Sequence, residues 1–283
     1  MRTLPGRTLL LLLLFPVTAL ADIAVRVPVV TQVQGAALFR TSLTVANGSG
    51  GHSADIVLRL SYRSLVDGTF QNVTLSEGSL LPHRTLFFED IVQHFKDEGS
   101  IRSQDRTANL FGTLLVTFVA SGQQLEDSIA EARTYSAANG GGTNGIAYIG
   151  RNASTAGSDT IKGAVRNGAF GADGTTRANI GFVNEGTVVT DVEITYYDGA
   201  TGATLKDFVQ SSLSVGEVVQ LNNIFADSAV PPGTRSIVVR AQAVAGNGRI
   251  SGYGVQLDSV TQDASFFLMV EENQCGGGYV PPG

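Results

Sequence analysis

An internal repeat constrains the fold of this chain more than any other feature. The block 39–47 aligns with 176–184, so that Asn47 falls on Asn184. Further blocks recur in the same order, and the aligned pairs are 55–60 with 191–196, 80–91 with 213–224, 114–119 with 237–242, and 128–135 with 251–258. The repeat distance is well above the roughly 50 residues of the longest solenoid repeats, so the pattern indicates two copies of a whole domain.

The blocks read largely as β-strands. Ile180 and Phe182 alternate with Gly181 and Val183, and a period of two residues places one face of a strand in a core. Asn-Gly and Asp-Gly pairs separate the blocks, because these residues accept the positive φ of hairpin turns. In the second copy, strands are expected at 178–184, 189–197, 203–210, 216–221, 235–243, 249–257 and 264–270.

Seven short antiparallel strands at this spacing are typical of an immunoglobulin-like sandwich. The sequence therefore predicts an all-β protein with two tandem Ig-like antiparallel β-sandwich domains. The chain has no Trp and a single Cys, so the Cys…Trp…Cys core of true Ig domains is absent and "Ig-like" describes the architecture alone. One helical turn is expected after the fourth strand of each copy, at 88–95 and around 223–226.

The domain boundaries follow from local composition. The segment 140–158 is rich in Gly, Asn, Ser and Thr and is expected to connect the domains, which places the first at 22–150 and the second at 151–272. Gly and Pro dominate 273–283, which is expected to be a flexible tail. The charged segment 96–106 is predicted to be an exposed loop.

The first 21 residues have the three parts of a signal peptide. Basic residues begin it, an apolar run from Leu9 to Phe15 follows, and Ala19 and Ala21 supply the small residues of a cleavage site. The apolar run is far shorter than the roughly 20 residues of a membrane-spanning helix. The sequence therefore predicts an exported protein, secreted, at the cell surface or periplasmic, with no transmembrane segment after signal cleavage.

Charge and cysteine content exclude further classes. The formal net charge is −6, and an acidic chain is a poor ligand for the phosphate backbone of a nucleic acid. Cys275 is the single cysteine, so no disulfide can form within the chain and hydrophobic cores must hold the domains. The thiol is either an intermolecular disulfide partner or an incidental free cysteine.

The repeated motifs resemble a known group of sequences. The run from Phe39 to Asn47, the later Glu89-Asp90-Ile91 segment and the run from Val255 to Asp263 are similar to a group of uncharacterised exported proteins of environmental bacteria. In that group the same sandwich is typically paired. The resemblance covers most of 28–270 and implies fold and export, but no activity. The first copy departs from it at 131–150.

The histidines do not form a recognisable catalytic or metal-binding pattern. They are His52, His83 and His94, all in the first copy, and they lack metal-ligand spacing. A Gly-x-Ser-x-Gly elbow before a helix is also absent. We therefore predict no catalytic, metal-binding or cofactor-binding residue and no cofactor.

Acidic residues offer only weak alternatives. Paired carboxylates could support glycoside hydrolysis, and the adjacent pairs are Glu89-Asp90, Asp97-Glu98, Glu126-Asp127 and Glu271-Glu272. Each is expected to be solvated, because adjacent side chains in a loop diverge. Calcium requires six to eight clustered oxygens, and the candidates are Asp159, Asp173, Asp258, Gln262 and Asp263, which are too sparse.

These observations lead to three hypotheses of function. The leading one is a non-enzymatic structural or adhesive protein whose partner is an unknown protein or glycan at the cell surface, with the loops 96–108 and 139–150 as the first places to search. The alternative is a carbohydrate- or ligand-binding module that uses Tyr196 or Tyr197, with Tyr62 at the similar place in the first copy. The weakest is a hydrolase with an unrecognised site.

Overall fold

The computed structural model describes residues 22–35, 37–120, 128–137, 142–167, 176–244, 248–258 and 264–272. The described part of the chain is all-β, as predicted, apart from one short helix and two single turns of 3-10 helix. The predicted signal peptide, 1–21, and the predicted tail, 273–283, lie outside these residues. No helix within the described ranges is long and apolar enough to cross a membrane.

The described residues of the first half of the chain form nine strands. They are β1 (Ile23–Gln34), β2 (Leu38–Ala46), β3 (Ala54–Arg63), β4 (Phe70–Leu80), β5 (Thr85–Phe88), β6 (Leu110–Val119), β7 (Ile129–Ala137), β8 (Thr143–Ile149) and β9 (Arg151–Asn152). Helix α1 (Ile91–Asp97) and the turn η1 (Ser103–Asp105) lie between β5 and β6.

Nine strands are also found within the described ranges of the second half. They are β10 (Thr160–Arg166), β11 (Thr176–Asn184), β12 (Thr190–Asp198), β13 (Thr204–Leu213), β14 (Val218–Leu221), β15 (Ser236–Ala243), β16 (Ile250–Asp258), β17 (Ala264–Leu268) and β18 (Val270–Glu271). The turn η3 (Ile224–Ala226) follows β14, where the sequence predicted a short helical segment.

The strands pair in the same antiparallel order in both halves. In the second half, a five-stranded sheet, β13-β12-β15-β10-β18, is separate from a four-stranded sheet, β14-β11-β16-β17. The first half repeats this order as β4-β3-β6-β1-β9 and β5-β2-β7-β8, but the end of β1 also pairs with β2 and joins the nine strands into one sheet. The halves therefore correspond strand for strand, in agreement with the sequence repeat. The alignment of 128–135 with 251–258 is wrong by one residue, because with Asn47 placed on Asn184 the strand pairing puts Ile129, not Ser128, in the place of Ser251.

The expected connection at 140–158 is wrong, because much of it is strand. Thr143–Ile149 pairs with β7 as β8, and Arg151–Asn152 pairs with β1 as β9. Gly145 explains why a glycine-rich segment can be a strand here: a Cβ at this position would lie 2.6 Å from the carbonyl oxygen of Thr134 on β7. Glycine permits this close approach of two backbones. The strand β10 was also missed by the sequence patterns.

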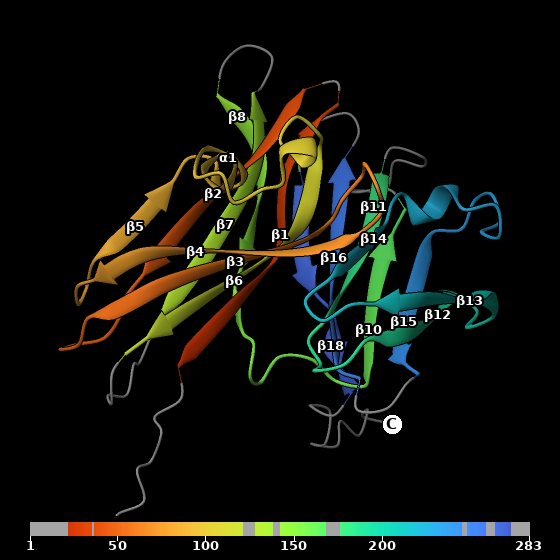
Figure 1. Ribbon diagram of the computed structural model, residues 1–283. Helices are drawn as coiled ribbons and strands as arrows, with labels where there is room; N and C mark the ends of the chain where they lie inside the picture. The colour runs from red at the N-terminus through yellow and green to blue at the C-terminus, as the bar shows by residue number, and fades with distance from the viewer. Residues whose placement is uncertain are drawn as a thin grey trace, which may run out of the picture.

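Two hydrophobic cores fill the halves, and one sheet contributes to both. Ile180 and Phe182 of β11 are buried in the second core, against the five-stranded sheet. Val183, Tyr253 and Val255 point from the opposite face of the same four-stranded sheet into the first core. The four-stranded sheet consequently lies between the five-stranded sheet and the first half, with β11, β14 and β16 at the centre of the molecule (Figure 1).

The two asparagines that the repeat aligns have the same structural role. Asn184 is fully buried, and its Nδ2 donates hydrogen bonds of 2.8 Å to the carbonyl oxygens of Val188 and Leu213. Its Oδ1 accepts a bond of 2.9 Å from the backbone N–H of Gly186. Asn47 makes the equivalent three bonds in the first half. Each asparagine therefore fixes the turn between two strands from inside the fold.

We expect Asn184→Ala to lower the free energy of unfolding by about 2–3 kcal/mol, because it removes the partners of three backbone groups, two of which are buried. Urea unfolding monitored by circular dichroism measures the change. Asn222→Ala, at an exposed position, is the matched control and should shift the value by less than about 0.5 kcal/mol. Equal effects of the two substitutions would contradict the role assigned to Asn184.

Candidate functional site

Among the described residues, three ion pairs join the two halves; one joins Arg151 of β9 to Glu271 of β18, and the other two lie at one end of the four-stranded sheet. Arg26 Nε lies 2.6 Å from Glu185 Oε2, and both side chains are almost completely buried. Arg63 binds Glu217 through two parallel hydrogen bonds, of 2.5 Å from Nε and 2.8 Å from Nη2. Each arginine belongs to the first half and each carboxylate to the second, so the pairs hold one relative placement of the two halves.

These residues are placed by the ends of strands. Glu185 follows β11 and Glu217 precedes β14, so both carboxylates lie at one end of the four-stranded sheet. Arg26 and Arg63 belong to β1 and β3 of the first half. Thr113 on β6 adds a bond of 2.6 Å to the carbonyl oxygen of Gly216. We call this contact between the halves, centred on the two ion pairs, the seam.

Aromatic side chains complete the seam. The ring of Tyr253 packs edge-on to Tyr148 of β8 at 6.2 Å between centroids, and stacks on Phe266 at 6.0 Å. Burial raises the pKa of Tyr253 well above its ordinary value, so its hydroxyl stays protonated and donates to Gln220 at 2.9 Å. A Cβ on Gly181 would lie 2.1 Å from this ring, so glycine is required beside it.

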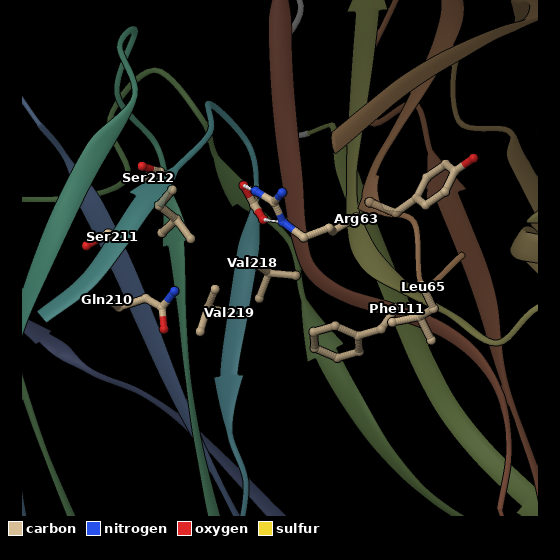
Figure 2. Close-up of a pocket in the computed structure, with 11 residues that line it drawn as sticks. Arg63, Leu65, Phe111, Gln210, Ser211, Ser212, Val218 and Val219 are labelled. Atoms are coloured by element: carbon tan, nitrogen blue, oxygen red, sulfur yellow. Dashed lines mark hydrogen bonds and ion pairs between the residues drawn. The ribbon is translucent and has the colours of Figure 1, made fainter. Parts of the chain in front are cut away.

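A pocket of about 360 Å³ opens at the margin of the seam. The first half contributes Tyr62, Arg63, Leu65 and Phe111, and the second half contributes 210–213 and 217–219. Figure 2 shows Val218 and Val219 between the β13 residues on one side and Leu65 and Phe111 on the other, with Arg63 at one end. Pockets at the contact between two units of a protein are common ligand sites, so this seam pocket is the candidate functional site.

One wall of the seam pocket has a strained backbone. Ser212 has a φ of 59°, in the left-handed region that non-glycine residues rarely adopt. Its N–H donates a hydrogen bond of 2.6 Å to Asp191 Oδ1, next to an irregularity in the pairing of β12 with β13. Such strain persists only where the surrounding structure imposes it, and it occurs preferentially at binding sites.

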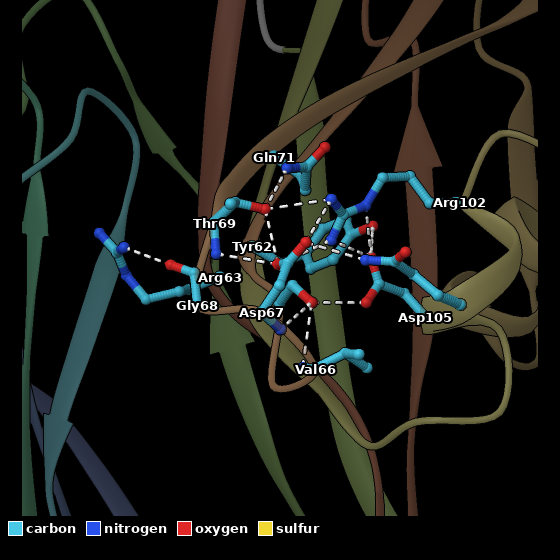
Figure 3. A network of polar contacts seen from close by, with 11 residues as sticks. Tyr62, Arg63, Val66, Asp67, Gly68, Thr69, Gln71, Arg102 and Asp105 are labelled. Atoms are coloured by element: carbon cyan, nitrogen blue, oxygen red, sulfur yellow. Dashed lines mark hydrogen bonds and ion pairs between the residues drawn. The ribbon is translucent and has the colours of Figure 1, made fainter.

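A polar network supports the other wall (Figure 3). The buried carboxylate of Asp105 accepts hydrogen bonds from the Tyr62 hydroxyl at 3.0 Å, the Ser64 hydroxyl at 2.6 Å and Arg102 Nε at 2.8 Å. Arg102 also pairs with Asp67. The network ties the β3–β4 hairpin, which carries Leu65, to the segment after α1. It therefore fixes the rim of the seam pocket.

The network also explains two perturbed carboxylates. Burial opposes ionisation of Asp105, but the hydrogen bonds that it accepts outweigh burial and lower its pKa below the ordinary value. A hydrogen bond from Arg102 is the main cause of the lowered pKa of Asp67. Burial and the bond to Asp105 raise the pKa of Tyr62 to about 12, so this phenol remains a donor at neutral pH.

We expect the protein to lose stability as the pH falls below about 4, the pKa of an unfolded aspartate. In the folded protein, Asp67 and Asp105 have lower pKa values than that, so the folded state binds fewer protons than the unfolded state. The stability that these two carboxylates contribute is therefore lost as they become protonated. Urea midpoints measured from pH 7 to pH 2 test this. Asp105→Asn should flatten the loss, whereas Asp55→Asn, exposed and outside the network, should leave the slope unchanged.

The structure does not bring the three histidines together. His94 on α1 contacts Glu77 Oε1 at 2.8 Å, His83 is exposed, and His52 lies in the turn after β2. Within the described ranges, no group of three or more His, Cys, Asp or Glu side chains could hold a metal ion.

Two of the paired carboxylates make structural contacts instead of converging on a shared site. Asp90 caps α1 by accepting from the backbone N–H of Gln93. Glu271 is buried and pairs with Arg151 at 2.7 Å, which corrects the expectation that it is solvated. Asp173, Gln262, Asp263, Cys275 and the pair Glu126-Asp127 lie outside the described residues, as does the side chain of Asp258.

The tyrosines proposed as a sugar platform are mostly buried. Tyr196 is 1% exposed and packs edge-on to Phe208 at 5.6 Å, and Tyr62 is 2% exposed, so neither can stack on a ligand. The expectation for these two residues is wrong, because both side chains face a core. Tyr197 on the opposite face of β12 remains half-buried.

The two loops singled out from the sequence are also corrected. Most of 139–150 is the strand β8. The segment 96–108 is not an exposed loop throughout, since Ile101 and Asp105 are buried in it. Many of its other residues are exposed, as expected, and Arg102 supports the seam pocket.

The seam residues were not found from the sequence. Arg26 lies in the apolar run of β1, and a charged residue inside such a run is a signal of a buried ion pair. Its partner is 159 positions away, so no local pattern identifies Glu185. The same is true of Arg63 and Glu217, which are 154 positions apart.

Comparisons with known proteins do not assign a family. No protein-family model matches the chain, and no curated protein matches it significantly. A protein described as secreted, from Parabacteroides distasonis, aligns over 88% of this chain and 83% of its own with 11% identity and a TM-score of 0.20. A Pleurotus ostreatus lectin solved with GalNAc aligns over 86% and 79% with 11% identity and a TM-score of 0.17. Similarity at this level carries no argument about fold or function.

Proposed function

We propose that this chain is a non-enzymatic exported protein with a structural or adhesive role, formed by two Ig-like sandwich domains that act as one rigid unit. The observation that supports this most directly is the presence of the Arg26–Glu185 and Arg63–Glu217 ion pairs across the seam. Arg26 and both carboxylates are almost fully buried, at 5% exposure or less. A shifted placement that kept these groups buried would leave charges without partners, which is strongly unfavourable.

A rigid pair suits a structural or adhesive protein better than an enzyme that closes around a substrate. Flexible contacts between domains are generally small and polar, and they permit hinge motion. The seam adds a buried aromatic cluster around Tyr253 to its ion pairs, and the four-stranded sheet is packed on both faces. The domains therefore present their outer surfaces in one fixed arrangement.

Cross-linking in the native cell tests the proposal. A tagged full-length chain is expressed in the source organism, cross-linked, and recovered separately from cytoplasm, envelope and medium. We expect it in the envelope or medium, joined to a surface protein or glycan. A chain confined to the cytoplasm, or one without any adduct outside it, would contradict the proposal.

A second measurement addresses the absence of catalysis. The purified full chain is incubated with general esterase, protease and glycosidase substrates, and we expect no turnover above buffer. Turnover that co-purifies with the chain and disappears in an active-site-directed variant would replace the proposed role by that of a hydrolase.

A further inference from the structure

The seam pocket lies along a free strand edge. Among the described sheets β14 pairs with β11 alone and forms the edge of the four-stranded sheet. Val218 and Val219 both line the pocket, although successive side chains of a strand point to opposite faces. The pocket therefore runs past the edge of β14 rather than over one face. At such an edge alternate N–H and C=O groups point away from the sheet.

The walls of the seam pocket define the chemistry of a ligand. Leu65 is 70% exposed and forms an apolar rim together with the half-buried ring of Phe111. Gln210 and Ser211 on β13 provide neutral hydrogen-bonding groups on the other side. The charge of Arg63 is already matched by Glu217, so the pocket has no free charge to attract an ionic ligand.

We propose that the seam pocket binds an extended peptide segment of a partner protein, which pairs with the edge of β14 and inserts an apolar side chain between Leu65 and Phe111. An extended backbone is the ligand whose donors and acceptors repeat at the spacing of a strand edge, and strand addition of this kind is a common mode of peptide recognition. This inference rests on the proposed adhesive role, for which it names a class of partner.

The geometry limits the length of the bound segment. β14 contains four residues, so the paired part of the peptide spans about four residues with side chains alternating between two sides. One side faces Leu65 and Phe111 and selects an apolar residue. The other faces Gln210 and Ser211 and selects a small or polar residue.

Selection from a peptide library tests this inference. A phage library of random heptapeptides is panned against the purified full chain, and recovered peptides are measured by calorimetry. We expect sequences with apolar residues at alternate positions. Leu65→Asp should weaken them about tenfold or more, because it places a charge in an apolar contact. Val66→Asp is the matched control, since Val66 is 56% exposed in the same hairpin but does not line the pocket, and its effect should be below about twofold.

Backbone pairing is tested separately. N-methylation of alternate peptide amides should abolish binding when it falls on the amides that face β14, and should leave binding unchanged when it falls on the other set. In a second measurement, the amides of β14 should become protected from hydrogen exchange when the peptide binds. Recovery of no peptide, equal loss with Val66→Asp, or indifference to methylation at every position would overturn the inference. If peptide binding fails but cross-linking in the native cell yields a glycan adduct, the result supports the adhesive role and rejects the peptide site alone.

Discussion

Replacement of Arg26 by methionine should lower the free energy of unfolding by about 3–5 kcal/mol, since it leaves a buried carboxylate without its ionic partner. Within the described part of the chain, the Glu185 carboxylate would retain one hydrogen bond, of 2.9 Å from the Ser251 hydroxyl. Arg26 is itself poorly satisfied, because its Nη1 makes no hydrogen bond to the described residues. The loss therefore comes mainly from the isolated charge on Glu185 rather than from the strength of the pair.

The double variant Arg26→Met/Glu185→Leu separates these two contributions. Apolar residues of similar volume often replace a buried ion pair at little cost, so the double variant should unfold within about 1 kcal/mol of the wild type. Urea unfolding of the single and double variants provides the comparison. A double variant as unstable as Arg26→Met would show that the pair itself, not the unpaired carboxylate, stabilises the seam.

The second large effect is expected at Tyr253. Tyr253→Ala should cost about 3–5 kcal/mol, because it empties the centre of the aromatic cluster and leaves a cavity between the halves. The ring is fully buried and contacts both Tyr148 and Phe266. Thermal and urea unfolding measure the loss of stability, and small-angle X-ray scattering reports whether the two halves separate.

Tyr135→Ala is the matched control for this substitution. Tyr135 lies on β7, the strand that corresponds to β16, but on a half-exposed surface. Its removal should change the free energy of unfolding by well under half as much. Similar losses at Tyr135 and Tyr253 would indicate that the aromatic cluster of the seam contributes nothing beyond ordinary strand packing.

Much of the fold could be predicted because the signals are local. Period-two alternation and turn residues lie within a few positions of each other, and all seven strands expected in the second copy coincide with observed strands. The segments that were missed carry weak local signals. β8 contains Gly145 and polar residues, and it forms a strand because β7 provides an edge for it.

The candidate site could not be predicted, because every contact that builds it joins distant parts of the chain. Arg63 and Glu217 are separated by 154 positions and by the strands from β4 to β13. In the sequence, Leu65 has the pattern of an ordinary hairpin residue. It is recognised as part of a pocket only because Phe111 and β14 lie beside it in the fold. Sequence patterns identify which side of a strand is apolar, but they do not identify what covers it.

Local sequence patterns are enough to establish that the chain repeats one arrangement of strands and where most of those strands lie, since alternation and turn chemistry act over a few residues. Which of two equivalent surfaces is buried depends on tertiary contacts. Tyr253 and Val255 occupy the register positions that Glu131 and Arg133 occupy in the first half. The apolar pair lies in the seam and the charged pair is exposed. The physical reason is that burial of a sheet face depends on a complementary surface, to which Tyr148, more than 100 positions from Tyr253, contributes here.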